Sequence, residues 1–322
     1  MKDFSFSIPQ NIKAGAGSIK LLPELAGELG KKKGFIISGP HLNKIGMVEK
    51  CQKALLEAGI ECDSFTETEA NPSTDTVEKA ADKFRECGAD FIVAFGGGSP
   101  IDVAKAVAVV VTYGGKITEY EGAGKVKGPV VPIIAIPTTA GTGSEVTAFS
   151  VITDHERNYK LTVVSNYLLP TYAIIDPDLI KTVPAGTAAA CGIDAMVHAL
   201  EAYVSLAASP FSNIFAREAL KLIGGNIRDY VADRTNSKAG HQSGAHRRGV
   251  GQQQGQTQHP GGVASQPGDG GGDETDDDQG HAEGDQRAHQ RLDGQDDLHH
   301  IFIGDQANDD AQNHAHQQAC RQ

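Results

Sequence analysis

The chain has 322 residues, with 29 Lys and Arg against 41 Asp and Glu, a formal net charge of -12. This balance excludes the basic footprint of a nucleic-acid or anionic-membrane partner, and no apolar run approaches the ~20 residues of a membrane-spanning helix. The length predicts two domains or one large domain.

The composition changes near residue 238. Residues 1–238 hold 24 Lys and Arg against 27 Asp and Glu, whereas residues 239–322 hold 5 against 14. The second part also has sixteen of the eighteen Gln, nine of the twelve His and few large apolar residues. Five Cys without CxxC spacing, and an N-terminus without the apolar core of a secretory signal, predict reduced thiols and a cytoplasmic location.

From residue 21 onward, helical spacing alternates with short apolar runs. The predicted helices cover residues 21–29, 44–58, 76–86 (with Ser73 as N-cap) and 100–111. The predicted strands cover residues 34–38, 60–65, 90–95, 130–136 and 172–176, and a β-hairpin across a site is expected at 147–153 and 160–165. This order predicts an α/β fold whose mostly parallel sheet is covered on both faces. Helical spacing alone returns at 188–204 and 213–231.

A glycine-rich turn, GGGSP at residues 96–100, joins a predicted strand to a predicted helix. Backbone N–H groups at such a turn bind a pyrophosphate at the positive end of the helix. Asp102, expected in the first helical turn, suits the helix dipole. The alternative is a tight turn without a ligand, since GGGS is not the GxGxxG fingerprint.

A second loop, PTTAGTGSE at residues 137–145, follows the next buried strand. It combines two glycines with five hydroxyl or carboxylate side chains, which can bond phosphate, ribose or carboxamide groups. Ligands lie at the carboxyl ends of parallel strands, so two such loops favour one shared ligand over the alternative of a polar surface loop.

Asp194 and His198 are four residues apart in a predicted helix. This spacing places the carboxylate and the imidazole on one helix face, where both suit Fe(II) or Zn(II). The alternative is an ion pair on the helix surface, because two ligands do not make a tight metal site.

The chain resembles the iron-containing, or group III, alcohol dehydrogenase family, near its 1,3-propanediol, butanol and lactaldehyde dehydrogenases. The resemblance runs from about Phe4 to Val231. Three motifs carry it: GGGSPIDVAKA at 96–106, IPTTAGTGSEVT at 136–147 and GIDAMVHALEAY at 192–203.

The resemblance implies a Rossmann-like dinucleotide-binding domain, here residues 1–184, and an all-helical C-terminal domain that is truncated here. The start of this helical metal-binding domain covers residues 185–232, and a low-complexity tail covers 233–322. The resemblance also implies an oxidoreductase that uses NAD or NADP and Fe(II), with Zn as the alternative metal. Its substrate would be a small alcohol or aldehyde, and intact relatives form homo-oligomers.

The residues expected at the cofactor are Gly39, Asn71, Gly97, Gly98, Ser99, Asp102, Thr138, Thr139, Thr142 and Lys160. The family implies that Asp194 and His198 are two of four metal ligands and therefore catalytic. The metal would act as a Lewis acid on the alcohol oxygen and ease hydride transfer to the nicotinamide.

Two departures from the family stand out. Many relatives carry an Asp at the position of Gly39, where it repels a 2′-phosphate, so this chain is expected to tolerate NADP(H). The family's other two ligands lie in HxxxHPxG and PHG motifs, and neither motif occurs here. His259 precedes Pro260 without a helical pattern around it, and we interpret it as coincidence.

Three interpretations of the tail compete: a shifted reading frame, a disordered acidic tail, and a His-rich metal-binding tail. The first explains the abrupt change in composition best. We expect the chain as written to be poorly soluble and to have little dehydrogenase activity. The alternative function is a catalytically dead nucleotide-binding fragment with a disordered acidic tail.

Overall fold

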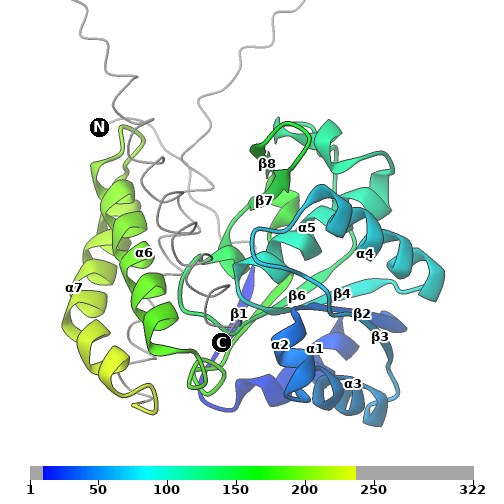
Figure 1. The fold of residues 1–322 in the computed structure, drawn as a ribbon, viewed down its shortest axis with the longest axis horizontal. Coiled ribbons are helices and arrows are strands. Elements are labelled where there is room, and N and C mark those ends of the chain that lie inside the picture. The colour runs from blue at the N-terminus through cyan, green and yellow to red at the C-terminus, as the bar shows by residue number, and fades with distance from the viewer. Residues whose placement is uncertain (1–9, 237–322) are drawn as a thin grey trace, which may run out of the picture. The chain divides into compact units, whose positions relative to one another are not determined.

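The computed structural model describes residues 10–236, so the tail at 237–322 and His259 lie outside the described part. Six strands form one sheet in the order β1-β9-β6-β4-β2-β3, and every neighbouring pair is parallel (Figure 1). The strands are β1 (Asn11–Ala14), β2 (Lys33–Ser38), β3 (Glu61–Phe65), β4 (Phe91–Gly96), β6 (Ile133–Pro137) and β9 (Tyr172–Ile175). The predicted Rossmann-like α/β fold is confirmed.

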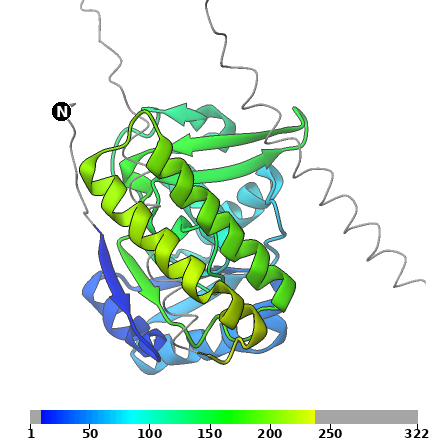
Figure 2. The same ribbon diagram turned by 90° about the vertical axis from the view of Figure 1, so that its left-hand side faces the viewer.

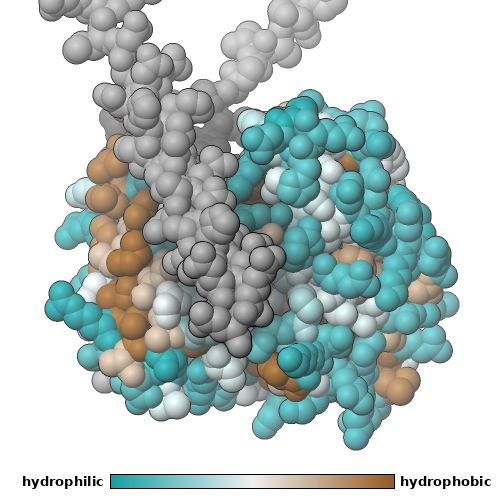
Figure 3. All heavy atoms as spheres, viewed as in Figure 1, coloured by the Kyte–Doolittle hydropathy of each residue, from teal (hydrophilic) through white to brown (hydrophobic). Residues whose placement is uncertain are grey.

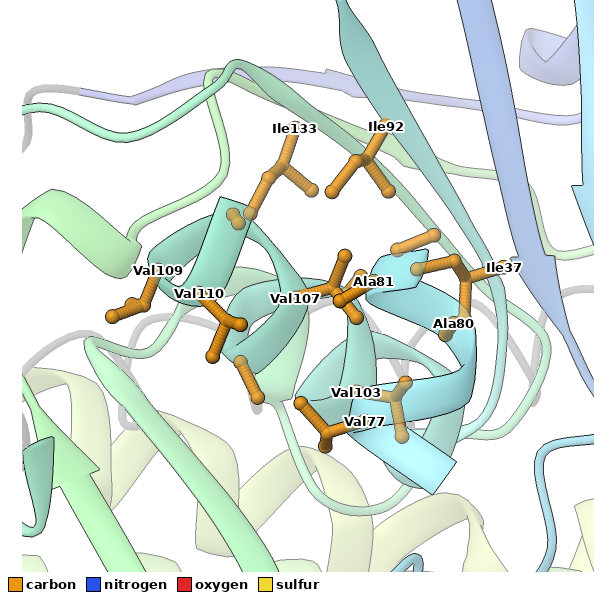
Figure 4. Close-up of a cluster of buried hydrophobic side chains, with 14 of the residues drawn as sticks. Ile37, Val77, Ala80, Ala81, Ile92, Val103, Val107, Val109, Val110 and Ile133 are labelled. Atoms are coloured by element: carbon orange, nitrogen blue, oxygen red, sulfur yellow. The ribbon is translucent and has the colours of Figure 1, made fainter. Parts of the chain in front are cut away.

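Alternate side chains of the central strands fill two separate cores, because successive residues of a strand point to opposite faces. On one face Ile37, Ile92 and Ile133 pack with α4 (Thr74–Cys87) and α5 (Gly98–Tyr113), as Figure 4 shows. On the other face, Ile36, Val93 and Ile134 belong to the core that includes residues of α1 (Leu22–Glu28) and α3 (Met47–Glu57). The sheet is therefore covered on both sides, as its apolar strands predict.

The helix predicted at 44–58 is present as α3, but its predicted start is wrong. The structure has α2 (Pro40–Lys44) and then α3, separated by Gly46 with a φ of 73°. This left-handed backbone suits glycine and ends the first helix. The N-cap at Ser73 is confirmed, since its side chain accepts a hydrogen bond from the backbone N–H of Thr76 at 3.2 Å.

The predicted hairpin is present as β7 (Phe149–Asp154) and β8 (Tyr159–Val164), which pair antiparallel. Together with β5 (Gly122–Ala123), they form a small second sheet. The backbone N–H of Thr153 donates to the carbonyl of Pro72 at 2.8 Å, so the hairpin is tied to the turn before α4. Short 3₁₀ turns occur at Ser18–Leu21, Ile117–Tyr120, Ser144–Val146 and Asn166–Leu168.

Two long helices follow, α6 (Ala185–Val204) and α7 (Pro210–Ala232), and Figure 2 shows them side by side. Small residues line their contact, and a Cβ on Gly192 would lie 2.5 Å from Ile227. The contact residues are Ala195, Ala199, Ala202, Ala216, Ala219 and Ile223. No helix in the described part is long and apolar enough to cross a membrane. A domain boundary at 184/185 stays a prediction.

Candidate cofactor site

The two polar loops begin side by side at the carboxyl edge of the sheet. Gly96 ends β4 and pairs in register with Pro137, which ends β6. The backbone N–H of Thr138 donates to the carbonyl of Gly96 at 2.9 Å. On the other side of β4, Phe95 pairs with Ser38, so Gly39 leaves the sheet at the same edge. This edge, where neighbouring strands send their connections in opposite directions, is the usual nucleotide position in open α/β sheets.

The glycine turn demands glycine for packing as well as for ligand approach. Gly96 has a φ of 154°, and a Cβ there would lie 2.7 Å from the Cγ of Pro100. A Cβ on Gly97 would lie 3.1 Å from the Oγ1 of Thr139, and one on Gly98 would lie 2.7 Å from the Cγ2 of Thr142. The two loops therefore touch directly, and side chains on this turn would separate them.

The sequence predicts Asp102 in the first turn of its helix, and this prediction is wrong. Because α5 begins at Gly98, Asp102 lies one turn further along. Its carboxylate accepts hydrogen bonds from the Oγ of Ser144 at 2.5 Å and the backbone N–H of Val151 at 3.3 Å. Burial raises the pKa of this carboxyl, while Lys105 and the bond from Ser144 act to lower it. In the structure Asp102 anchors the second loop, and its contact with a cofactor stays a prediction.

Lys105 was not singled out from the sequence, yet it is completely buried. Its Nζ donates to the carbonyls of Ser144, Thr147 and Phe149 at 2.6, 2.9 and 2.7 Å, and the hydroxyls of Ser144 and Thr147 lie 3.1 Å away. Burial lowers its pKa to about 8, against the attraction of Asp102 and Glu145. The sequence signal for this arrangement is the position of the lysine inside the apolar stretch AKAVAVVV, which indicates a buried side chain. A buried lysine needs several hydrogen-bond acceptors around it.

Asn71 and Lys160 lie on segments that the structure joins. Asn71 has a φ of 52° in the turn before α4. The carboxylate of Glu69 accepts the N–H of Ser73 at 2.9 Å and the hydroxyl of Thr76 at 2.7 Å, which stabilises this turn. Lys160 is exposed on β8 and pairs with Thr153, the residue bonded to this turn.

The predicted metal half-site is half-buried on α6. The Oδ1 of Asp194 and the Nε2 of His198 are 3.7 Å apart, so the predicted common helix face is confirmed. Residues 10–236 contain no group of three or more His, Cys, Asp or Glu side chains that could hold a metal. The N-terminal turn of α6 contacts the second loop, because Ala140 packs against the cluster of Ile180, Ala188 and Tyr230.

The parallel sheet and its two loops have the Rossmann-like arrangement that is found in the class of nucleotide-binding proteins. Comparison with known families is more specific: the iron-containing alcohol dehydrogenase family matches residues 9–177, and the C-terminal part of that family matches residues 188–244. The chain belongs to the iron-containing alcohol dehydrogenase family.

Individual relatives agree with this family. An NAD-dependent methanol dehydrogenase of Bacillus methanolicus is 40% identical over 229 residues, which are 71% of this chain and 60% of the relative. A crystal structure of 1,3-propanediol oxidoreductase superposes with a TM-score of 0.77 at 36% identity, covering 80% of this chain and 67% of that chain. A crystal structure of a sulfoacetaldehyde reductase of Bifidobacterium kashiwanohense in complex with NAD⁺ superposes with a TM-score of 0.73 at 30% identity. The match covers 78% of this chain and 67% of that chain. This chain thus spans about 60% of the length of the first relative.

Proposed function

We propose that the chain binds NAD(P)(H) at the carboxyl edge of its sheet and derives from an alcohol dehydrogenase that interconverts small alcohols and aldehydes. One observation carries the proposal: the turn 96–99 and the loop 138–142 leave adjacent strands and touch each other. A cytoplasmic location and a homo-oligomeric assembly belong to the same proposal.

The chemistry of the two loops suits a dinucleotide. The first backbone N–H groups of α5, a 16-residue helix, have no acceptor within the helix and face the pyrophosphate in this proposal. Gly97, Gly98 and Ser99 supply them. Thr138, Thr139 and Thr142 present hydroxyls nearby, and Asn71 and Lys160 approach from the turn and the hairpin.

The described residues supply only part of a metal site. A catalytic metal usually has at least three protein ligands, and the described residues offer two, Asp194 and His198. These residues by themselves do not fit a complete iron or zinc site, and we derive no reaction step through one. This observation favours the second candidate, a nucleotide-binding fragment without turnover.

Titration of the full chain with NADH and NADPH tests the proposal. The chain has no Trp, so calorimetry or the fluorescence of the reduced nicotinamide itself is the suitable signal. Saturable binding of one nucleotide per chain supports the proposed site. Absence of binding by a folded chain contradicts it.

Turnover of a primary alcohol, with and without added Fe(II), then separates the two candidates. An active dehydrogenase loses turnover on Asp194→Asn or His198→Gln, while its nucleotide affinity stays unchanged. Nucleotide binding without turnover under all metal conditions supports the fragment.

A further inference from the structure

We propose that the Lys105 ammonium acts as a built-in monovalent cation that positions the second cofactor loop against the glycine turn. The role toward the cofactor rests on the proposed function. The role in ordering the loop does not depend on it. In this proposal Lys105 is a positioning residue that does not touch the nucleotide.

The surroundings of Nζ are those of a cation site. Five oxygen atoms lie within 2.6–3.1 Å, and three of them are backbone carbonyls from the segment 144–149. Converging carbonyl oxygens replace the hydration shell of a monovalent cation in the same way. An ammonium group has only three protons to donate, so the three shortest contacts, all to carbonyls, account for them.

A chain of contacts links this cation to the glycine turn. Lys105 holds Ser144, whose Oγ also donates to Asp102 at 2.5 Å. The backbone N–H of Ser144 donates to the Oγ1 of Thr142 at 3.3 Å. Thr142 in turn lies against Gly98, where a Cβ would be only 2.7 Å away.

In this proposal the positive charge of Lys105 keeps the second loop in place. A side chain of the same length without the charge does not. Without the ammonium, the carbonyls of Ser144, Thr147 and Phe149 lose their shortest hydrogen bonds, and Ser144 keeps only the longer bonds from the N–H and hydroxyl of Thr147 at 3.3 and 3.4 Å. The converging oxygens then repel one another unless the segment moves. Movement of Ser144 carries Thr142 away from Gly98. A neutral side chain of similar length therefore fails to replace lysine.

Chemical rescue tests this proposal. In Lys105→Ala, propylammonium replaces the missing Cγ, Cδ, Cε and Nζ atoms, while in Lys105→Met the uncharged side chain occupies that space. The measurements are hydrogen exchange of the amides in 138–151 and affinity of the full chain for NADPH and NADH. Tetramethylammonium at the same concentration, too large to enter, controls for ionic strength.

We expect both variants to lose protection in 138–151 and about tenfold or more in nucleotide affinity. Propylammonium restores both signals in Lys105→Ala but not in Lys105→Met, and tetramethylammonium restores neither. If Lys105→Ala does not fold, the same amines are added during refolding, and recovery with propylammonium alone is the expected result.

Three outcomes overturn the proposal. One is wild-type behaviour of Lys105→Met, another is failure of propylammonium to rescue Lys105→Ala. The third is an equal loss of affinity in Val107→Ala, a cavity variant in the core packed on α5 (Figure 4). If the wild-type chain binds neither nucleotide, the proposed function fails. The hydrogen exchange of the amides in 138–151 still tests whether Lys105 orders the loop.

Discussion

Gly98 lies so close to Thr142 that a Cβ on Gly98 would stand 2.7 Å from the Cγ2 of the threonine. The glycine is the second residue of the GGS sequence that opens α5, and the threonine belongs to the loop after β6. A glycine in this turn is therefore required by loop packing even before a phosphate is considered. Because Gly98 has no side chain, Thr142 can lie against it, and the two loops form one continuous surface.

The first prediction concerns Gly98→Ala. The new methyl group forces Thr142 away and separates the loops, so we expect nucleotide affinity to fall by about tenfold or more and unfolding free energy by about 1–3 kcal/mol. Calorimetric titration and urea unfolding measure the two effects.

The matched control is Gly225→Ala on α7, where an added Cβ meets nothing within 4 Å. It is expected to stabilise the chain by about 0.5–1 kcal/mol, because alanine is a better helix former, and to leave affinity unchanged. Thr142→Ala in the Gly98→Ala background should recover part of the lost stability. Simple additivity of the two changes would argue against a direct clash.

The second prediction concerns cofactor choice at Gly39. Its φ of -94° is open to other residues, and an added Cβ lies 3.3 Å from the carbonyl oxygen of Thr68, a tight but adjustable contact. We expect Gly39→Asp to weaken NADPH binding about tenfold relative to NADH, because a carboxylate here repels a 2′-phosphate. Gly39→Asn has the same shape without the charge and should not discriminate. A wild-type chain that already prefers NADH strongly contradicts the idea.

The third prediction is a pH dependence from Lys105, which faces the carboxylates of Asp102 and Glu145. Burial lowers its pKa from 10.5 to about 8. Between these pH values the unfolded chain keeps a proton that the folded chain has released, so this lysine makes the free energy of unfolding rise with pH. Relative to Lys105→Met, the free energy of unfolding rises by at most about 1.4 kcal/mol per pH unit. The slope is about half of this value at pH 8 and fades about one pH unit below it. Urea unfolding of both proteins from pH 7 to pH 9.5 measures it, and a constant difference refutes the shift.

The fourth prediction concerns the exposed apolar side chains of α6 and α7, which include Ile193, Val197, Leu200, Val204 and Ile214. Figure 3 shows the hydrophobic surface over these helices. An apolar face of this kind promotes self-association. We expect Leu200→Lys combined with Val204→Lys to raise the soluble monomeric fraction in light scattering.

The control is Leu56→Lys on α3, because Leu56 is 64% exposed and Val204 is 67% exposed. Leu56 lies outside the α6–α7 face, so its replacement should leave association unchanged. A wild-type chain that is monomeric at all concentrations tested rules out association through this face.

The sequence by itself determined the layers of the α/β fold. Runs such as residues 91–96 are apolar on both faces of a strand, which requires helices on both sides. The same local reasoning found Ser73, because an N-cap acts only three residues away. It misplaced the start of the helix predicted at 44–58, because the helical spacing continues through Gly46, which has a left-handed backbone.

The tertiary structure alone decided which groups meet. The register that places Gly96 beside Pro137 joins residues 41 positions apart, and the contacts of Lys105 with Ser144 span 39. Such contacts depend on how strands pair and helices pack, and spacing along the chain does not encode them. For this reason the sequence indicated Asp102 only by its place near the start of a helix. The fold alone shows that its carboxylate accepts a hydrogen bond from Ser144 and that Lys105 donates to backbone carbonyls of the second loop and the segment after it.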